Sequence, residues 1–157
     1  MSHSPMIDKS SRLVGSVLEL FVSKKSANKI ILDSSGIIGD KFYGKDINRS
    51  VLISSIDSYN MAKEKNIELK YGLLGENILI DYNPYNLTTD IFIQIGSVIL
   101  EITQQCTLCK SLAKIDNKLP KLLKDDRGIF ARVIKAGEIR YKDSVYILQT
   151  NKLKEKR

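Results

Sequence analysis

The stretch GSVILEITQQCTLCKSL, at residues 96–112, places the strongest constraint on how this chain can fold. From residue 97 to residue 103, apolar and polar side chains alternate over much of the length. This period of two is typical of a half-buried strand, because successive side chains of a strand point to opposite faces. The side chains expected on the buried face are Val98, Leu100 and Ile102.

Two thiols follow this predicted strand, at Cys106 and Cys109. Thr107 is expected to cap a short helix, which would place Cys109 at the second helical position. Free backbone N–H groups at the start of a helix stabilise a thiolate, and Lys110 and Lys114 add positive charge nearby. The sequence therefore predicts an activated sulfur at the end of a strand.

Most other apolar residues fall in short runs that also predict strands. These strands are expected near residues 13–23, 29–33, 51–54, 78–81, 91–95, 129–134 and 138–148, with the last two joined as a hairpin by a turn at Ala136 and Gly137. Short helices are expected after Ser54 or Ser55, after Thr107, and after Asn117. Many short strands without a regular alternation of strand and helix predict a mainly β domain, a closed β-barrel with a few short helical insertions.

The length of 157 residues and an apolar content of 43% fit a single domain. We expect residues 1–11 to be a disordered segment, residues 12–149 to form the domain and residues 150–157 to be a basic tail. The last seven residues carry four basic side chains and one acidic one, so they supply +3 of the net charge of +7. The rest is only mildly basic and has neither tryptophan nor a cluster of aromatic side chains, which makes nucleic acid an unfavoured partner.

The sequence predicts neither a membrane span nor an export signal. The segment LVGSVLELFV, at residues 13–22, contains Glu19 and alternates like a strand. Two cysteines three residues apart do not make the disulfide framework of a secreted protein. We therefore expect a cytoplasmic location.

Four motifs stand in an order that resembles the MOSC domain, the family named for the C-terminal part of molybdenum cofactor sulfurases. They are GIIGDKF followed by Arg49, GLLGENI, the strand after Gly96 that ends in ITQQCTLCKSL, and RGIFARVIKAGEI with Asp143 before the final strand. The resemblance covers about residues 13–148. It implies a β-barrel with short helices and a cysteine that carries sulfur or meets the molybdenum cofactor (molybdopterin).

The resemblance assigns the family cysteine to Cys109, because KSL follows it, whereas Cys106 stands where many relatives have a different residue. Some relatives reduce N-hydroxylated compounds when the cofactor is bound. The chain lacks the pyridoxal phosphate-dependent desulfurase domain of the long sulfurases, so we expect a sulfur donor or an electron donor protein as a partner. The sequence is compatible with a homodimer, and it does not decide between sulfur transfer and oxidoreductase activity.

Several residues in these motifs are candidates for binding the cofactor. They are Gly39, Asp40, Arg49, Glu76, Asn77, Arg127 and Arg132. Arginine suits the phosphate of a pterin because its planar guanidinium binds phosphate through two hydrogen bonds. Each arginine could instead form a surface salt bridge, and Glu76 and Asn77 could instead fix their loop by hydrogen bonds to the backbone.

The Cys106 and Cys109 pair has four interpretations. A structural zinc site needs four ligands, and the chain offers only His3 besides the two thiols. The others are dithiol redox chemistry, a sulfur-handling thiolate at Cys109 with Cys106 as the resolving thiol, and two inert buried thiols. Among the protein side chains, we expect only Cys109 to be a metal ligand, and the metal it would bind is molybdenum. The alternative function is a non-enzymatic basic β-barrel module that binds RNA or a protein.

Overall fold

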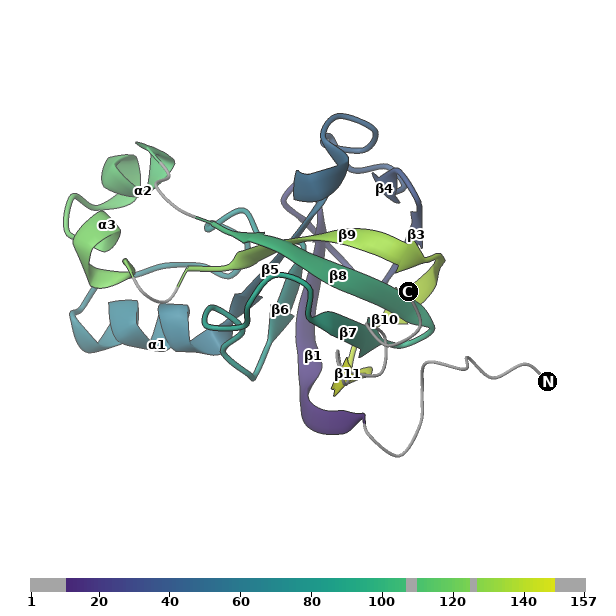
Figure 1. Ribbon diagram of the computed structural model, residues 1–157. Coiled ribbons are helices and arrows are strands. Elements are labelled where there is room, and N and C mark those ends of the chain that lie inside the picture. Colours follow the sequence, from purple (N-terminus) through teal and green to yellow (C-terminus); the bar gives the residue numbers. More distant parts are fainter. Residues whose placement is uncertain (1–10, 107–109, 125–126, 149–157) are drawn as a thin grey trace.

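The computed structural model of the chain describes residues 11–106, 110–124 and 127–148 (Figure 1). The strands are β1 (Arg12–Val22), β2 (Lys25–Ala27), β3 (Lys29–Asp33), β4 (Gly36–Ile37), β5 (Val51–Ser55), β6 (Ile78–Ile80), β7 (Phe92–Ile95), β8 (Val98–Gln105), β9 (Ile129–Lys135), β10 (Gly137–Arg140) and β11 (Ser144–Leu148). The helices are α1 (Ile56–Glu64), α2 (Lys110–Ile115) and α3 (Leu119–Leu122), with a 3₁₀ helix, η1 (Ile47–Arg49).

Seven strands form a closed barrel, which confirms the predicted fold class. Their order is β11-β7-β8-β9-β5-β6-β1, and β1 pairs again with β11 to close the circle. Neighbours are antiparallel except β5 and β6, which run parallel because α1 lies between them in the chain. The short strands β10, β3 and β4 form a separate sheet, and β2 extends from β1 as a hairpin.

Apolar side chains from all seven barrel strands fill the barrel interior. Val98, Leu100 and Ile102 on β8 belong to this core, as the period of two predicts. Ile99 points to the other face of β8 but is also buried, because it packs with Phe92 and Leu148. Both faces are therefore covered at the start of β8, whereas Gln104 and Gln105 at its end are exposed.

A second, smaller core lies among the three α-helices, which gather at one end of the barrel in Figure 1. Its buried members are Ala62, Ile67, Leu112, Leu119 and Leu123. Ser55 caps α1, as expected, because its side chain accepts a hydrogen bond from the backbone N–H of Asp57 at 2.9 Å.

The predicted cap at Asn117 is wrong, because α3 has Lys118 at its N-cap position without a side-chain hydrogen bond. Asp116 holds this turn instead, accepting a hydrogen bond from the backbone N–H of Lys118 at 2.8 Å. The predicted cap at Thr107 lies outside the described residues.

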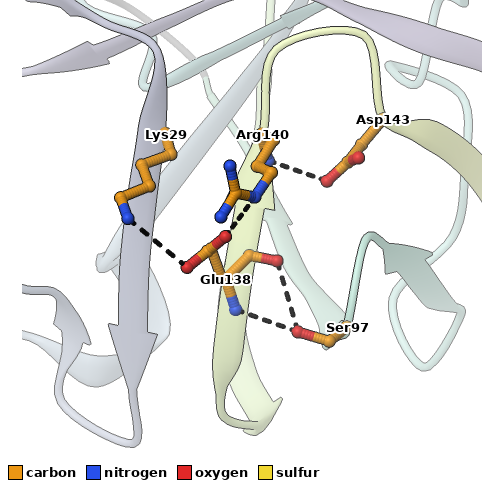
Figure 2. Close-up of polar contacts among 5 residues, drawn as sticks. All are labelled: Lys29, Ser97, Glu138, Arg140 and Asp143. Carbon is orange, nitrogen blue, oxygen red and sulfur yellow. Dashed lines mark hydrogen bonds and ion pairs between the residues drawn. The ribbon is translucent and has the colours of Figure 1, made fainter.

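The predicted hairpin between residues 129–134 and 138–148 is also wrong. The second segment is two strands, of which β10 pairs with β3 and β11 pairs with β7 and β1. The chain turns between them because the Asp143 carboxylate accepts a hydrogen bond from the backbone N–H of Arg140 at 2.7 Å (Figure 2). Lys142 takes a positive φ of 74° in this turn.

Figure 2 also shows how β10 is attached to its neighbours. The Ser97 hydroxyl, in the turn between β7 and β8, accepts a hydrogen bond from the Glu138 N–H at 3.0 Å and donates one to the Glu138 carbonyl at 3.3 Å. The Glu138 carboxylate forms ion pairs with Lys29 on β3 and with Arg140. Glu138 thus links the small sheet to the turn between β7 and β8, and Ile30, Leu32, Ile37 and Ile139 of the same sheet pack into the barrel core.

No helix among the described residues is long and apolar enough to cross a membrane.

Gly96 packs closely against Glu138 on β10 and against Asp143 in the turn between β10 and β11, and this contact leads to a stability prediction. A Cβ added at Gly96, which has φ of 57°, would lie 2.5 Å from Asp143 Oδ2 and 2.7 Å from the Glu138 carbonyl. A Cβ at Gly44, with φ of 73°, would meet nothing within 4 Å. We expect Gly44→Ala to cost about 1 kcal/mol from the left-handed backbone alone, and Gly96→Ala to cost roughly 3 kcal/mol because it adds a steric clash. Urea unfolding of both variants measures this, and equal losses would contradict it.

Candidate functional site

A pocket of about 500 Å³ lies against the outer wall of the barrel. Leu52 on β5 and Phe130 on β9 pair opposite one another and both line it. Their sequence neighbours on both sides are fully buried in the barrel core, so alternation points Leu52 and Phe130 outward. The other lining residues are Ser23, Lys24, Asp40, Lys41, Phe42, Lys45, Asp46, Arg49, Leu73, Leu74, Gly75, Asn77 and Cys106.

Asp40 is the residue that joins two of the loops around the pocket. One carboxylate oxygen accepts hydrogen bonds from the Ser23 N–H at 2.7 Å and the Asn77 side-chain amide at 3.2 Å. The other accepts from the Phe42 N–H at 3.1 Å. Ser23 and Lys24 both have positive φ, 49° and 70°, in the two-residue turn between β1 and β2. Asp40 therefore holds this turn, and with it Lys24, at the edge of the pocket.

Asn77 joins β1 and β5 beneath the same pocket. Its side-chain oxygen accepts a hydrogen bond from the Leu52 N–H at 3.0 Å, and its amide group donates to the Phe21 carbonyl at 3.3 Å as well as to Asp40. The side chain is buried, so each of these bonds replaces one to water. Asn77 contributes to the pocket wall chiefly by fixing the backbone around it.

Glu76 lies behind the pocket wall and does not line the pocket. It is 1% exposed, and one carboxylate oxygen accepts hydrogen bonds from the Tyr59 hydroxyl at 2.6 Å and the Gly72 N–H at 2.9 Å. Burial raises the pKa of Glu76 above its ordinary value, and burial together with the adjacent Glu76 charge raises the pKa of Tyr59. These bonds anchor the loop that carries Leu73 and Leu74 into the pocket wall.

Four cationic side chains line the pocket: Lys24, Lys41, Lys45 and Arg49. The Arg49 guanidinium carbon lies 4.7 Å from the centre of the Phe130 ring, a cation–π contact between two residues that line the pocket. Within the part of the chain that the structure describes, Arg49 forms no ion pair. Of the two lining acids, Asp40 is occupied by the bonds above, and Asp46 accepts a hydrogen bond from the Asn48 N–H. The pocket therefore presents net positive charge.

Cys106 is half-buried at the end of β8, where its N–H donates to the Gly128 carbonyl at 2.9 Å. It lines the large pocket and also a small cavity of about 20 Å³. The small cavity is otherwise lined by Leu52, Ser54, Leu74, Leu112, Leu123, Arg127 and Gly128. Cys106 thus lines both the large pocket and the small cavity.

The three candidate arginines lie in different surroundings. Arg49 lines the large pocket, and Arg127 lines the small cavity. The Arg127 Nη2 donates to the Pro120 carbonyl at 2.7 Å. Arg132 lines neither and forms an ion pair with Glu101, at 2.7 Å from Nη2 and 2.8 Å from Nε.

The structure thus brings Asp40, Arg49, Asn77 and Cys106 to one pocket, with Arg127 behind Cys106. Gly39 precedes Asp40 with a φ of 92° but is not a lining residue. Cys109, the cysteine assigned by the family resemblance, lies outside the described residues. No group of three metal-ligating side chains occurs in residues 11–106, 110–124 and 127–148.

Sequence reasoning missed part of this site. Alternation on the predicted strands could have placed Leu52 and Phe130 on an outer face, but not opposite one another. Lys24 had no signal, because Ser-Lys lacks the glycine or asparagine that usually marks a two-residue hairpin turn.

The raised pKa of Glu76 predicts a dependence of stability on pH. The folded state holds the proton of the Glu76 carboxyl group more tightly than the unfolded state does. Protonated Glu76 therefore makes its full contribution to the free energy of unfolding below pH 4.5, and this contribution is lost as the pH rises through the folded-state pKa. Glu76→Gln keeps a neutral side chain and removes that loss. As the pH rises from 4.5, we expect the free energy of unfolding of Glu76→Gln to increase relative to that of the wild type. Exposed Glu68→Gln is the matched control, and parallel pH curves for Glu76→Gln and the wild type would contradict the prediction.

Comparison with solved structures shows the same fold elsewhere. The YuaD protein from Bacillus subtilis superposes with a TM-score of 0.76 at 17% sequence identity, over 88% of this chain and 97% of that one. YiiM from Escherichia coli superposes with a TM-score of 0.69 at 15% sequence identity, over 86% of this chain and 70% of that one. YiiM from Geobacillus stearothermophilus superposes with a TM-score of 0.65 at 12% sequence identity, over 88% of this chain and 75% of that one.

No curated protein sequence matches the chain. The sequence profile described as MOSC domain matches residues 38–146, which is more than half of the chain and includes most of the lining of the pocket. The chain therefore belongs to the MOSC domain family.

Proposed function

We propose that this protein binds the molybdenum cofactor in the large pocket and handles sulfur at its cysteines, of which Cys106 lines that pocket. The observation that carries the proposal is the arrangement of one thiol, an apolar floor and four cations around a single pocket of about 500 Å³. Pockets of this size accept small cofactors. Membership of the MOSC domain family supports this choice of ligand.

The pocket residues fit a ligand that combines a planar ring system with a phosphate. Leu52, Leu73, Leu74 and Phe130 supply apolar surface for a ring. Arg49 supplies a guanidinium that Phe130 orients and that no described acidic side chain neutralises. Such a group can donate two parallel hydrogen bonds to a phosphate, with the lysines adding charge.

The cofactor, when bound, would supply a redox-active metal centre. The chain's own contribution is to present sulfur, to neutralise the phosphate and to fix the pocket. Cys106 presents a thiol to the pocket, and Cys109 follows three residues later. Asp40 and Asn77 keep the surrounding loops in place through buried hydrogen bonds, so they act on the ligand through the backbone.

The activity that follows is sulfur transfer or oxidoreductase chemistry, including reduction of N-hydroxylated compounds. Both need a second protein as a donor of sulfur or electrons. The mouth of the pocket is accessible to such a partner, since Phe42 and Leu73 on its rim are 52% and 40% exposed. We propose a cytoplasmic location for this chemistry, where thiols stay reduced.

Arg49 and Arg132 make a matched pair for testing the cofactor site. Arg49→Ala removes a charge-assisted contact to the phosphate, which is worth roughly 1.5–3 kcal/mol, or about a tenfold to hundredfold weaker affinity. Arg132→Ala removes an arginine that is paired with Glu101 outside the pocket. After purification from cells that make the cofactor, we expect Arg49→Ala to retain much less pterin than Arg132→Ala.

Equal pterin content in the two variants would contradict the assignment of Arg49. Absence of pterin from the wild type, with RNA binding that weakens steeply as salt rises, would favour the alternative of a nucleic-acid binding module.

A further inference from the structure

We propose that Glu76 controls one wall of the large pocket through its protonation, holding that wall in place while it is neutral and releasing it when it ionises. The wall segment concerned is residues 70–75, the wall loop, which contributes Leu73, Leu74 and Gly75 to the pocket lining. The inference rests on the proposed function only in taking this pocket as the ligand site. It does not depend on which ligand binds there.

The backbone of the wall loop is held by two side chains. Among the described residues, its hydrogen bonds to side chains go only to Tyr59 on α1 and to Glu76. The Gly72 N–H lies 2.9 Å from a Glu76 carboxylate oxygen and 3.0 Å from the Tyr59 hydroxyl oxygen, so it donates to both. The Leu74 N–H donates to the same hydroxyl at 3.4 Å. The position of the loop in the pocket wall therefore depends on this pair.

Apolar contacts support the wall loop but leave much of it exposed. A Cβ added at Gly72 would lie 2.9 Å from the ring of Phe21 on β1, so the loop packs closely against that ring. Tyr71 packs edge-to-face on Tyr59 with ring centres 4.9 Å apart, yet it is 48% exposed. Leu74 packs against the small core among the helices. A loop with this exposure can open without unfolding the barrel.

Glu76 is an anchor that tolerates charge poorly. Its side chain is 1% exposed, and the two hydrogen bonds that it accepts from Tyr59 and Gly72 both go to the same oxygen. The other oxygen, Oε1, is buried and has no hydrogen-bond partner among the described residues. A proton on Oε1 removes the charge and leaves both bonds intact, whereas an ionised carboxylate is left with one bare oxygen in an apolar place.

No cation compensates for the charge of an ionised Glu76. Among the described residues, Glu76 forms no ion pair, and no charged side chain of α1, the wall loop or β6 acts on it. Tyr59 is the titratable group in contact with it. Burial and the Glu76 charge raise the pKa of Tyr59, so its hydroxyl stays a donor. Burial likewise raises the pKa of Glu76, which means that ionisation weakens the closed wall.

The size of the effect follows from linkage between proton binding and loop opening. Opening exposes Glu76 and returns its pKa to the ordinary 4.5, while the closed state has a higher pKa. Below pH 4.5 the carboxyl group is neutral in both states, so the wall is held most firmly there. Above it, the ratio of open to closed loop rises about tenfold per pH unit until the closed-state pKa is passed, and is then constant. A ligand would enter and leave more readily at the higher pH.

Amide hydrogen exchange of the full-length, ligand-free protein, followed by NMR, tests this proposal. The Gly72 N–H reports the hydrogen bonds of the anchor, and the Gly75 N–H, which donates to the Gly72 carbonyl at 3.0 Å, reports the pocket wall. The Ile102 N–H, which donates to the Ile91 carbonyl at 2.9 Å, reports the barrel. We expect protection of Gly72 and Gly75 to fall about tenfold per pH unit above 4.5 and then level off. At every pH it should be at least about tenfold lower than that of Ile102.

Two variants assign the pH dependence to one side chain. Glu76→Gln removes the titrating group, and Glu68→Gln, at an exposed position, is the matched control. We expect protection of Gly72 to be independent of pH in Glu76→Gln and to follow the wild type in Glu68→Gln. An unchanged slope in Glu76→Gln, equal protection of Gly72 and Ile102, or a response of Gly72 that Gly75 does not share would overturn the proposal.

If Glu76→Gln does not fold, Tyr59→Phe takes its place. The Tyr59 hydrogen bond lowers the pKa of Glu76, so its loss raises the closed-state pKa further. The fall in Gly72 protection should then continue to a higher pH before it levels off, and an unmoved plateau would overturn the proposal. Because no ligand is present, failure of this test leaves the cofactor proposal standing, and absence of pterin from the purified protein leaves this result unaffected.

Discussion

The pairing of β1 with β11 is the interaction on which the rest of the structure depends. The first part of β1 pairs with β11, and the later part pairs with β6 on one edge and β2 on the other. Without the contact to β11 the sheet would have open edges and the core would face water on one side. The same strand ends at the turn that carries Lys24, so closure of the barrel also places one edge of the pocket.

Buried polar side chains connect this scaffold to the site. Asp40 and Asn77 satisfy backbone groups of two loops and of strands β1 and β5. Glu76 with Tyr59 anchors the loop of Leu73 and Leu74 from behind the pocket wall. Asp40, Glu76 and Asn77 are in motifs that resemble the family, yet the contacts that the structure shows for them are with the protein itself. The charged groups that line the pocket are chiefly the cations, with Arg49 foremost, and Cys106 lines the same pocket.

Alternation in the sequence was sufficient to predict the barrel, because it decides which face of a strand is buried, whereas the candidate pocket residues came from the motifs that resemble the family. Val98, Leu100 and Ile102 show this directly. The break between β10 and β11 was not predictable, since it depends on Asp143 folding back onto the Arg140 backbone within a run that alternates like one strand. Neither was the separation of Arg127 from Arg132, because their difference comes from tertiary partners, the Pro120 carbonyl and Glu101.

The central claim is that a molybdenum cofactor occupies the pocket beside Cys106. Its most direct test compares protein purified from cells that make the cofactor with protein from cells that do not, measuring molybdenum, pterin and the rate at which Cys106 is alkylated. The account predicts stoichiometric metal and pterin in the first preparation, with Cys106 alkylated more slowly than in the second because the ligand covers it. Absence of both groups from the first preparation, with Cys106 equally reactive in the two, would contradict it.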